Sequence, residues 1–193
     1  MPNNQDATFV KKSFQIEVST GKIIEPIIFE VFTASAPPHF TWASALVLAS
    51  FVVAISETFK ISEKTFLEIG AGSALPSVTA ALLGAKRVII TDRYQADLTI
   101  QTVFRALEAN CIASNCEILP LNWRDSCTLD SDAFPSVDFI LGSDVFYSSE
   151  DLDSIIFTVA VFMHKNPNTI FYTSYQERRF AIIYISISHL SAS

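Results

Sequence analysis

The sequence is poor in glycine and cysteine, and it lacks a long uninterrupted apolar run. The three cysteines, Cys111, Cys116 and Cys127, contain no C-x-x-C pair, and such a sparse, odd set predicts reduced thiols in a cytoplasmic or nuclear protein and no metal site. The longest apolar stretch, residues 40–55, contains three hydroxyl side chains and is too short for a membrane span. Residues 1–12 have no apolar core of the secretory type. We therefore expect neither membrane insertion nor secretion.

Basic residues are also scarce. The chain has 13 Lys and Arg against 20 Asp and Glu, a net charge of −7, which argues against a protein that binds nucleic acid through phosphate contacts. The same charge would suit a basic protein or peptide substrate, although solubility alone also explains it. Half of the 193 residues are hydrophobic and sixteen are Phe, so the chain is long and apolar enough to form one folded domain.

Three of the five glycines lie in one stretch, residues 65–93. It opens with a short apolar run at 65–69, continues through a glycine turn at 70–72 and a helical pattern of small residues, and closes with a second apolar run that ends at Asp92. This order of strand, glycine turn, helix and strand predicts one βαβ unit, around which the rest of the chain is organised.

The side chains of this unit indicate what it binds. Glycines after a parallel strand let a ligand approach the backbone closely, and Asp92, about twenty residues beyond the turn, could accept hydrogen bonds from ribose hydroxyls. Leu75 stands where a dinucleotide site needs a small residue, and Glu68 would repel a pyrophosphate, so a nicotinamide dehydrogenase is disfavoured. A positively charged ligand such as S-adenosyl-L-methionine fits better. The alternative is a glycine-rich turn in an ordinary α/β protein.

The remaining pattern predicts further elements on both sides of this unit. Residues 1–40 are expected to form an N-terminal extension, with a frayed start through residue 8 and a β-hairpin within residues 14–32, and residues 41–193 to form the main domain. Helices are predicted at residues 41–58, with Thr41 as N-cap, 74–83, 95–110 and 150–163, and strands at 116–122, 137–142 and 169–173.

Five short motifs occur in order along the chain. They are Trp42 in the first predicted helix, Glu68-Ile69-Gly70-Ala71-Gly72, Asp92, Asn122-Trp123, and Asp144-Val145-Phe146-Tyr147. Together, over residues 41–176, they resemble the lysine-methyltransferase-like group of seven-strand enzymes, known as methyltransferase family 16, whose D-x-x-Y/F motif follows the fourth strand. The resemblance implies a Rossmann-like, doubly wound α/β sheet in which the glycine turn and residues 143–147 face each other at the switch point.

The resemblance also implies roles for individual residues. The S-adenosyl-L-methionine pocket would be formed by Trp42, Glu68 at the methionine end, Gly70, Ala71, Gly72, Asp92 at the ribose, Arg93, Asn122, Trp123 beside the adenine, and Ser143. Asp144 and Tyr147 would border the methyl acceptor, Asp144 by aligning a cationic group. The expected acceptor is a protein nitrogen on lysine or arginine, with arginine of a nuclear protein such as a histone favoured. Without the resemblance, Asp144 could be a cap or turn residue, and Tyr147 and Trp42 packing aromatics.

The end of the chain departs from the family pattern. Relatives continue after the fifth strand with a helix and two strands, whereas residues 180–193 could supply one further strand, around Ile182 to Ile185. Two function classes therefore stay open: an active protein methyltransferase, or a non-catalytic or shortened relative that keeps a cofactor- or partner-binding role. A small-molecule methyltransferase is a weaker third possibility.

Overall fold

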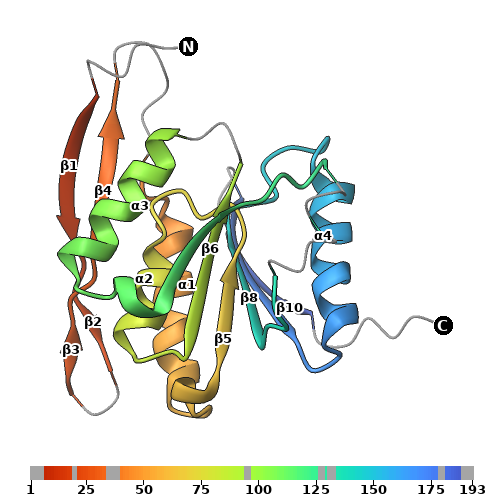
Figure 1. Cartoon of the computed structure of the whole chain (residues 1–193), viewed down its shortest axis with the longest axis horizontal. Coiled ribbons are helices and arrows are strands. Elements are labelled where there is room, and N and C mark those ends of the chain that lie inside the picture. The colour runs from red at the N-terminus through yellow and green to blue at the C-terminus, as the bar shows by residue number, and fades with distance from the viewer. Residues whose placement is uncertain are drawn as a thin grey trace.

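A six-stranded sheet runs through the centre of the molecule (Figure 1). The computed structural model describes residues 7–18, 21–33, 40–93, 97–125, 129, 134–177 and 181–187. The strand order is β10-β9-β8-β5-β6-β7, in which all neighbours are parallel except β10, which is antiparallel to β9. The strands are β5 (Thr65–Glu68), β6 (Arg87–Asp92), β7 (Cys116–Pro120), β8 (Phe139–Ser143), β9 (Ile170–Glu177) and β10 (Ala181–Ile187).

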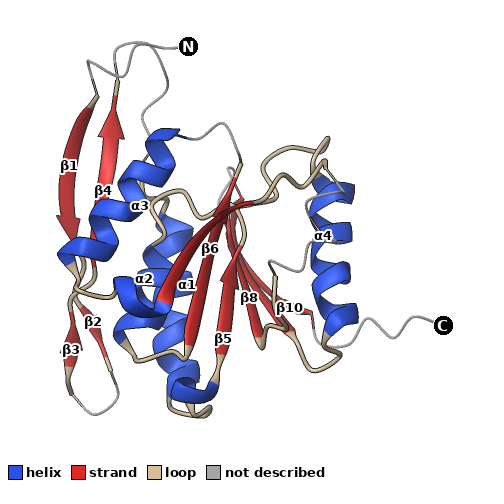
Figure 2. Ribbon diagram, in the orientation of Figure 1, coloured by secondary structure: helices blue, strands red, loops and turns tan. Residues whose placement is uncertain are grey.

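Both faces of the sheet are covered, as Figure 2 shows. Successive side chains of a strand point to opposite faces, so in β5 the buried Phe66 joins one core cluster and the buried Leu67 joins the other. The first cluster lies under three helices and the second under one. The helices are α1 (Ala43–Ser56), α2 (Leu75–Leu82) and α3 (Asp97–Ala109) on one face, and α4 (Leu152–Lys165) on the other, with short 3-10 turns η2 (Ile61–Glu63) and η3 (Ala113–Asn115).

This arrangement confirms the predicted doubly wound α/β sheet. The chain reverses direction across the sheet at β5, which pairs with β6 on one side and β8 on the other. The expected elements of the main domain are all present, with bounds that differ by a few residues. The largest difference is β9, which runs to Glu177 instead of ending at residue 173, and β10 supplies the single further strand expected near Ile182 to Ile185.

The N-terminal hairpin is longer than predicted. Strand β1 (Thr8–Ser13) pairs with β4 (Ile27–Phe32), and beyond them β2 (Ile16–Glu17) pairs with β3 (Ile23–Ile24). The expected frayed start through residue 8 was therefore wrong at its last residue, because Thr8 pairs with Phe32. The strand was missed because β1 is an exposed edge that carries consecutive lysines instead of an alternating apolar pattern.

The hairpin packs on the main domain. The Asn110 side chain at the end of α3 accepts a hydrogen bond from the Ile27 N–H at 3.0 Å and donates one to the Ile27 carbonyl at 2.6 Å. At the other end of β4, Glu30 Oε1 accepts a hydrogen bond from the Thr41 N–H at 3.1 Å. The predicted boundary at residue 40 adjoins residues 34–39, which lie outside the described residues, and it stays a prediction.

Thr41 is not the N-cap of α1, because that position is Trp42, and the Thr41 hydroxyl donates to Ser73 Oγ at 3.0 Å instead.

Cys111 and Cys116 are free thiols, and burial raises the pKa of Cys116 to about 12. Cys127 lies outside the described residues. Among the described residues, none of the helices has the length and apolar character needed to cross a membrane.

Candidate functional site

The glycine turn after β5 is held by backbone hydrogen bonds. Gly70 and Gly72 have φ angles of 61° and 52°, in the left-handed region that favours glycine. Between them, the Ala71 N–H donates to the Thr91 carbonyl of β6 at 2.9 Å. The Gly72 N–H donates to Asp92 Oδ2, also at 2.9 Å. The turn is thus tied to the end of the neighbouring strand at two points.

The two glycines differ in what surrounds them. A Cβ added to Gly70 would lie 2.8 Å from the Trp123 ring and 3.3 Å from the Val145 side chain, whereas one added to Gly72 would meet nothing within 4 Å. Gly70 therefore has to be glycine for reasons of both space and backbone conformation. The side of the turn at Gly72 is open, as the approach of a ligand to backbone would require.

Glu68 lies beneath the turn rather than at its surface. The side chain is 1% exposed, and its Oε2 accepts a hydrogen bond from the Ser77 N–H at 3.0 Å, in the first turn of α2. Burial raises the pKa of Glu68 to about 8. The hydrogen bonds from Ser77 lower the pKa and the nearby Asp92 carboxylate raises it, but burial is the largest effect. The carboxyl group is therefore mostly neutral at pH 7 and supports the start of α2. Its contact with the methionine end of the cofactor stays a prediction.

Asp92, at the end of β6, connects the turn to the next strand. Besides Gly72, its carboxylate accepts a hydrogen bond from the Arg93 N–H at 2.7 Å, while the Asp92 carbonyl accepts one from the Leu121 N–H at 2.8 Å. The Gly72 and Arg93 N–H groups bind different carboxylate oxygens, Oδ2 and Oδ1, and each oxygen has a second lone pair. Asp92 is half-buried and can still accept hydrogen bonds from a ribose. The Arg93 side chain is exposed.

The residue pair after β7 closes the site from the side of β6. Trp123 is 8% exposed, its ring lies against Gly70, and its buried Nε1 has no hydrogen-bond partner among the residues that the structure describes. Asn122 is half-buried, and its Oδ1 accepts a hydrogen bond from the Arg124 N–H at 3.2 Å. The Arg124 guanidinium donates from Nε to Asp151 Oδ1 at 2.6 Å, which ties this loop to the start of α4. The predicted stacking of Trp123 on adenine stays a prediction.

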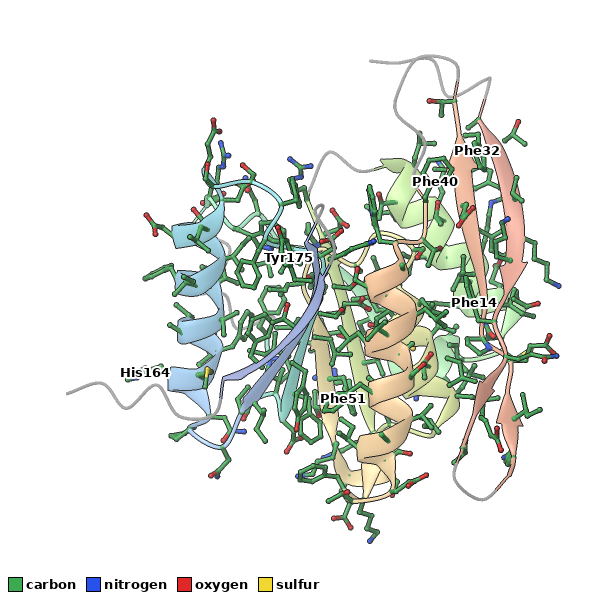
Figure 3. The ribbon with its side chains drawn as sticks, turned by 180° about the vertical axis from the view of Figure 1, so that it is seen from behind. Phe14, Phe32, Phe40, Phe51, His164 and Tyr175 are labelled. Atoms are coloured by element: carbon green, nitrogen blue, oxygen red, sulfur yellow. The ribbon has the colours of Figure 1, made fainter. Side chains whose placement is uncertain are left out.

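The start of α1 meets the end of β8 and Ser174 within β9. Figure 3 shows Phe40 and Tyr175 at this end of the sheet, away from Phe51 and His164. The buried Ser44 hydroxyl lies 3.1 Å from the Ser143 hydroxyl at the end of β8. Trp42, two residues earlier, is 53% exposed, so its ring is available at the rim and is not a core anchor.

The motif predicted to border the methyl acceptor, residues 144–147, follows β8 directly. Asp144 has a φ angle of 54°, which is unusual for a residue with a side chain, and its N–H donates to the Ser174 carbonyl of β9 at 2.8 Å. Its side chain is half-buried. Val145 is buried against Gly70, so the acceptor motif and the glycine turn are in contact. Tyr147 is 50% exposed, which disfavours a plain packing role.

A protein-family comparison matches residues 28–184 to a model described as lysine methyltransferase. The chain belongs to the lysine methyltransferase family. One curated relative is a Xenopus laevis protein named histone-arginine methyltransferase METTL23, which is 34% identical to this chain over 139 residues. The matched residues make up 72% of this chain and 57% of that protein. The protein N-terminal and lysine N-methyltransferase EFM7 of Candida glabrata is 29% identical over 147 residues, 74% of this chain and 57% of that one. The chain thus spans less than two thirds of the length of both relatives.

Solved structures show the same fold at lower identity. SMU.776, a protein assigned as a methyltransferase and crystallised with SAH, superposes with a TM-score of 0.60 at 16% identity and covers 86% of this chain and 43% of its own. The predicted cofactor, S-adenosyl-L-methionine, agrees with the family to which the chain belongs.

The residues of this family member fit such a cofactor. An open backbone face at Gly72, a carboxylate with free lone pairs at Asp92 and an unpartnered indole N–H at Trp123 lie at one edge of the sheet. All the predicted site residues lie at the carboxyl ends of β5 to β8 or at the start of α1, although Glu68 is covered. Sequence reasoning missed the serines and the arginine that join these segments, which belong to no motif: Ser44, Ser73, Ser174 and Arg124.

Proposed function

We propose that this chain is an S-adenosyl-L-methionine-dependent methyltransferase that modifies a nitrogen of a protein side chain. The observation that carries the proposal is the contact between the glycine turn and the segment after β8, where Gly70 and Val145 approach each other at the switch point of the sheet. In doubly wound sheets this is where ligands bind. Family membership supports the same chemistry.

The chain's own residues position the reactants in this proposal. The cofactor, when bound, supplies an electrophilic methyl group, so the protein needs to hold a nucleophile in line with it. Asp144 is half-buried beside the turn, and its carboxylate could accept hydrogen bonds from a cationic acceptor and orient it. Tyr147, exposed three residues later, could shape the entrance. Asp92 would hold the ribose, while Gly72 leaves room for the ligand.

Arginine of a basic nuclear protein, histones included, is the acceptor that we favour. The relative from Xenopus laevis is named as a histone-arginine methyltransferase. The net charge of −7 would attract a basic substrate without favouring nucleic acid. Lysine is the main alternative, because EFM7 is named as a lysine and N-terminal methyltransferase.

Calorimetric titration with S-adenosylhomocysteine and methyl transfer from radiolabelled cofactor to core histones test this proposal. Asp92→Asn should weaken S-adenosylhomocysteine binding about tenfold or more, because hydrogen bonds to a charged acceptor contribute roughly 1.5–3 kcal/mol. Asp138→Asn is a matched control, since that carboxylate accepts the Thr65 N–H at 2.8 Å between β5 and β8 but at the opposite end of the sheet. It should lower stability without changing the affinity.

The outcomes separate the open function classes. Transfer to histones that is lost in arginine-free peptides and kept in lysine-free ones would support the arginine assignment, and the reverse pattern would replace arginine with lysine. Binding of S-adenosylhomocysteine without transfer to any protein would favour a non-catalytic role. Equal affinities of the wild type, Asp92→Asn and Asp138→Asn would refute the site.

A further inference from the structure

Three serines, of which Ser44 and Ser174 are buried, join the start of α1 to the end of β8 and to β9. The Ser174 hydroxyl donates to the Ser44 carbonyl at 2.8 Å, and the Ser44 hydroxyl lies 3.1 Å from that of Ser143. Ser44 and Ser174 are 0% exposed. A buried hydroxyl is costly unless it is hydrogen-bonded, so an apolar contact would have been the simpler way to stabilise this junction. The hydrogen bonds instead fix the relative positions of three segments that are far apart in the sequence.

Ser174 holds both sides of the acceptor region at once. Its hydroxyl binds the first turn of α1, two residues after the exposed Trp42, while its carbonyl accepts the Asp144 N–H at 2.8 Å. Asp144 leaves the strand with a φ of 54°. Non-glycine residues keep such a conformation only when neighbouring contacts hold them there. The direction of the Asp144 side chain therefore depends on where Ser174 lies.

The glycine turn has a separate set of supports. It is held by the bonds from Ala71 to Thr91 and from Gly72 to Asp92, neither of which involves Ser44, Ser143 or Ser174, while the Thr41 hydroxyl bond to Ser73 Oγ links it to the segment before α1. A change at Ser174 should therefore alter the segment after β8 more than the glycine turn, although it also reaches Trp42 through the start of α1. The Ser44–Ser143–Ser174 junction holds the segment after β8 and the start of α1, whereas the bonds to Thr91 and Asp92 hold the glycine turn.

We propose that Ser174 and Ser44 are positioning residues for the methyl acceptor, which act by fixing Asp144 and the start of α1. This inference rests on the proposed function and deepens it. The two serines do not touch the reacting atoms. Their effect is expected mainly in the rate of transfer, which falls steeply when the acceptor is misplaced by about 1 Å, and to a smaller extent in cofactor affinity through Trp42.

The neighbouring residue Thr173 offers a matched control. Its hydroxyl, on a side chain that is 3% exposed, donates to the Gly142 carbonyl at 2.8 Å, the same type of bond at the same length. Thr173 points to the opposite face of the sheet from Ser174, because successive residues of a strand alternate. Ser174→Ala and Thr173→Val should therefore lower the melting temperature by a similar few degrees, but only the first disconnects α1.

The test compares the wild type, Ser174→Ala, Thr173→Val and Ser44→Ala. We expect Ser174→Ala to lower kcat about tenfold, Ser44→Ala to lower it by a smaller factor, and Thr173→Val to keep it within about twofold. The S-adenosylhomocysteine Kd of Ser174→Ala should change by a smaller factor than its kcat. Amide hydrogen exchange should rise in residues 41–48 and 143–148 for Ser174→Ala, and should be unchanged in residues 41–48 for Thr173→Val. Ser44→Ala keeps the carbonyl that Ser174 binds, so it provides a milder variant if Ser174→Ala does not fold.

Two results would overturn the inference. One is an equal kcat for Ser174→Ala and Thr173→Val. The other is unchanged exchange in residues 41–48 of Ser174→Ala, a measurement that needs no catalytic activity. A wild-type protein that transfers no methyl group would instead refute the proposed function, and hydrogen exchange would still decide whether the serines hold the acceptor side.

Discussion

The two sides of the site are built differently. On the side of β5 and β6, two N–H groups of the glycine turn donate hydrogen bonds to the Thr91 carbonyl and the Asp92 carboxylate, and Gly70 leaves no room for a methyl group beside Trp123. On the side of β8 and β9, serine hydroxyl bonds join the strands to the start of α1, and the Arg124–Asp151 ion pair ties the loop after β7 to the start of α4. The cofactor side depends on close packing, and the acceptor side on a few polar contacts.

The outer surface shows the same difference. Helices α1, α2 and α3 cover the first face of the sheet and the hairpin packs on the outside of these helices, whereas among the described residues α4 is the helix on the second face (Figure 2). Helix α4 buries Ile155 and Phe162 but exposes Leu152, Ile156 and Phe157. This division would suit the proposed function, in which the cofactor side keeps a single shape and the acceptor side admits a protein substrate.

Gly70 gives the largest expected effect on the cofactor side. Gly70→Ala should destabilise the protein by about 2–5 kcal/mol, because the left-handed backbone costs an alanine roughly 1–2 kcal/mol and the clash with the Trp123 ring adds about 1–3 kcal/mol. The same clash should abolish binding of S-adenosylhomocysteine. Urea denaturation and calorimetric titration measure the two effects.

Gly72→Ala is the control for that prediction. Its φ of 52° carries the same backbone cost, but the added methyl group would have no neighbour within 4 Å. We expect a loss of about 1–2 kcal/mol only. If both alanine variants were equally unstable, close packing at Gly70 would not be what distinguishes the cofactor side.

Glu68 predicts a pH dependence of stability. Its pKa is raised from 4.5 to about 8 in the folded protein, so between pH 5 and pH 7 the folded state keeps a proton that the unfolded state loses. Stability from this group therefore falls as the pH rises through that window, by about 2–3 kcal/mol. Glu68→Gln has no such titration. The difference in unfolding free energy between wild type and variant, measured at several pH values, isolates this contribution.

The direction in which the difference in unfolding free energy between wild type and Glu68→Gln changes with pH decides the protonation state of Glu68. The wild type should lose stability relative to Glu68→Gln as the pH is raised from 5 to 7. A constant difference would mean that water reaches the carboxyl group, and a wild type that gains relative stability would mean that Glu68 is held ionised, as a direct contact with a cationic ligand would require.

The sequence predicted the cofactor side more completely than the acceptor side. The glycine turn, Asp92 and the βαβ order are local features with a fixed spacing, and parallel strands necessarily bring their carboxyl ends together. The position of Glu68 could be predicted but its burial could not, because burial depends on how α2 packs over it.

The serine junction could not be predicted for a related reason. Ser44 and Ser174 are separated by 130 residues, and serine is common on surfaces, so nothing in the sequence marks either residue as buried. Strand β1 was missed because its lysines face solvent. In each case the decisive partner lies far away in the chain, and local patterns carry no information about it.

The smallest expected effect lies on the outer face of α4. Phe157 is 53% exposed and Phe162, on the same helix, is 1% exposed. Phe162→Ala should cost about 3–5 kcal/mol through the cavity that it leaves, whereas Phe157→Ser should change the unfolding free energy by no more than about 0.5 kcal/mol. Chemical denaturation of both variants measures this contrast, with S-adenosylhomocysteine affinity as the second readout. If Phe157→Ser cost more than about 1 kcal/mol, the outer face of α4 would have to be covered in solution, and the acceptor side would be as closely packed as the cofactor side.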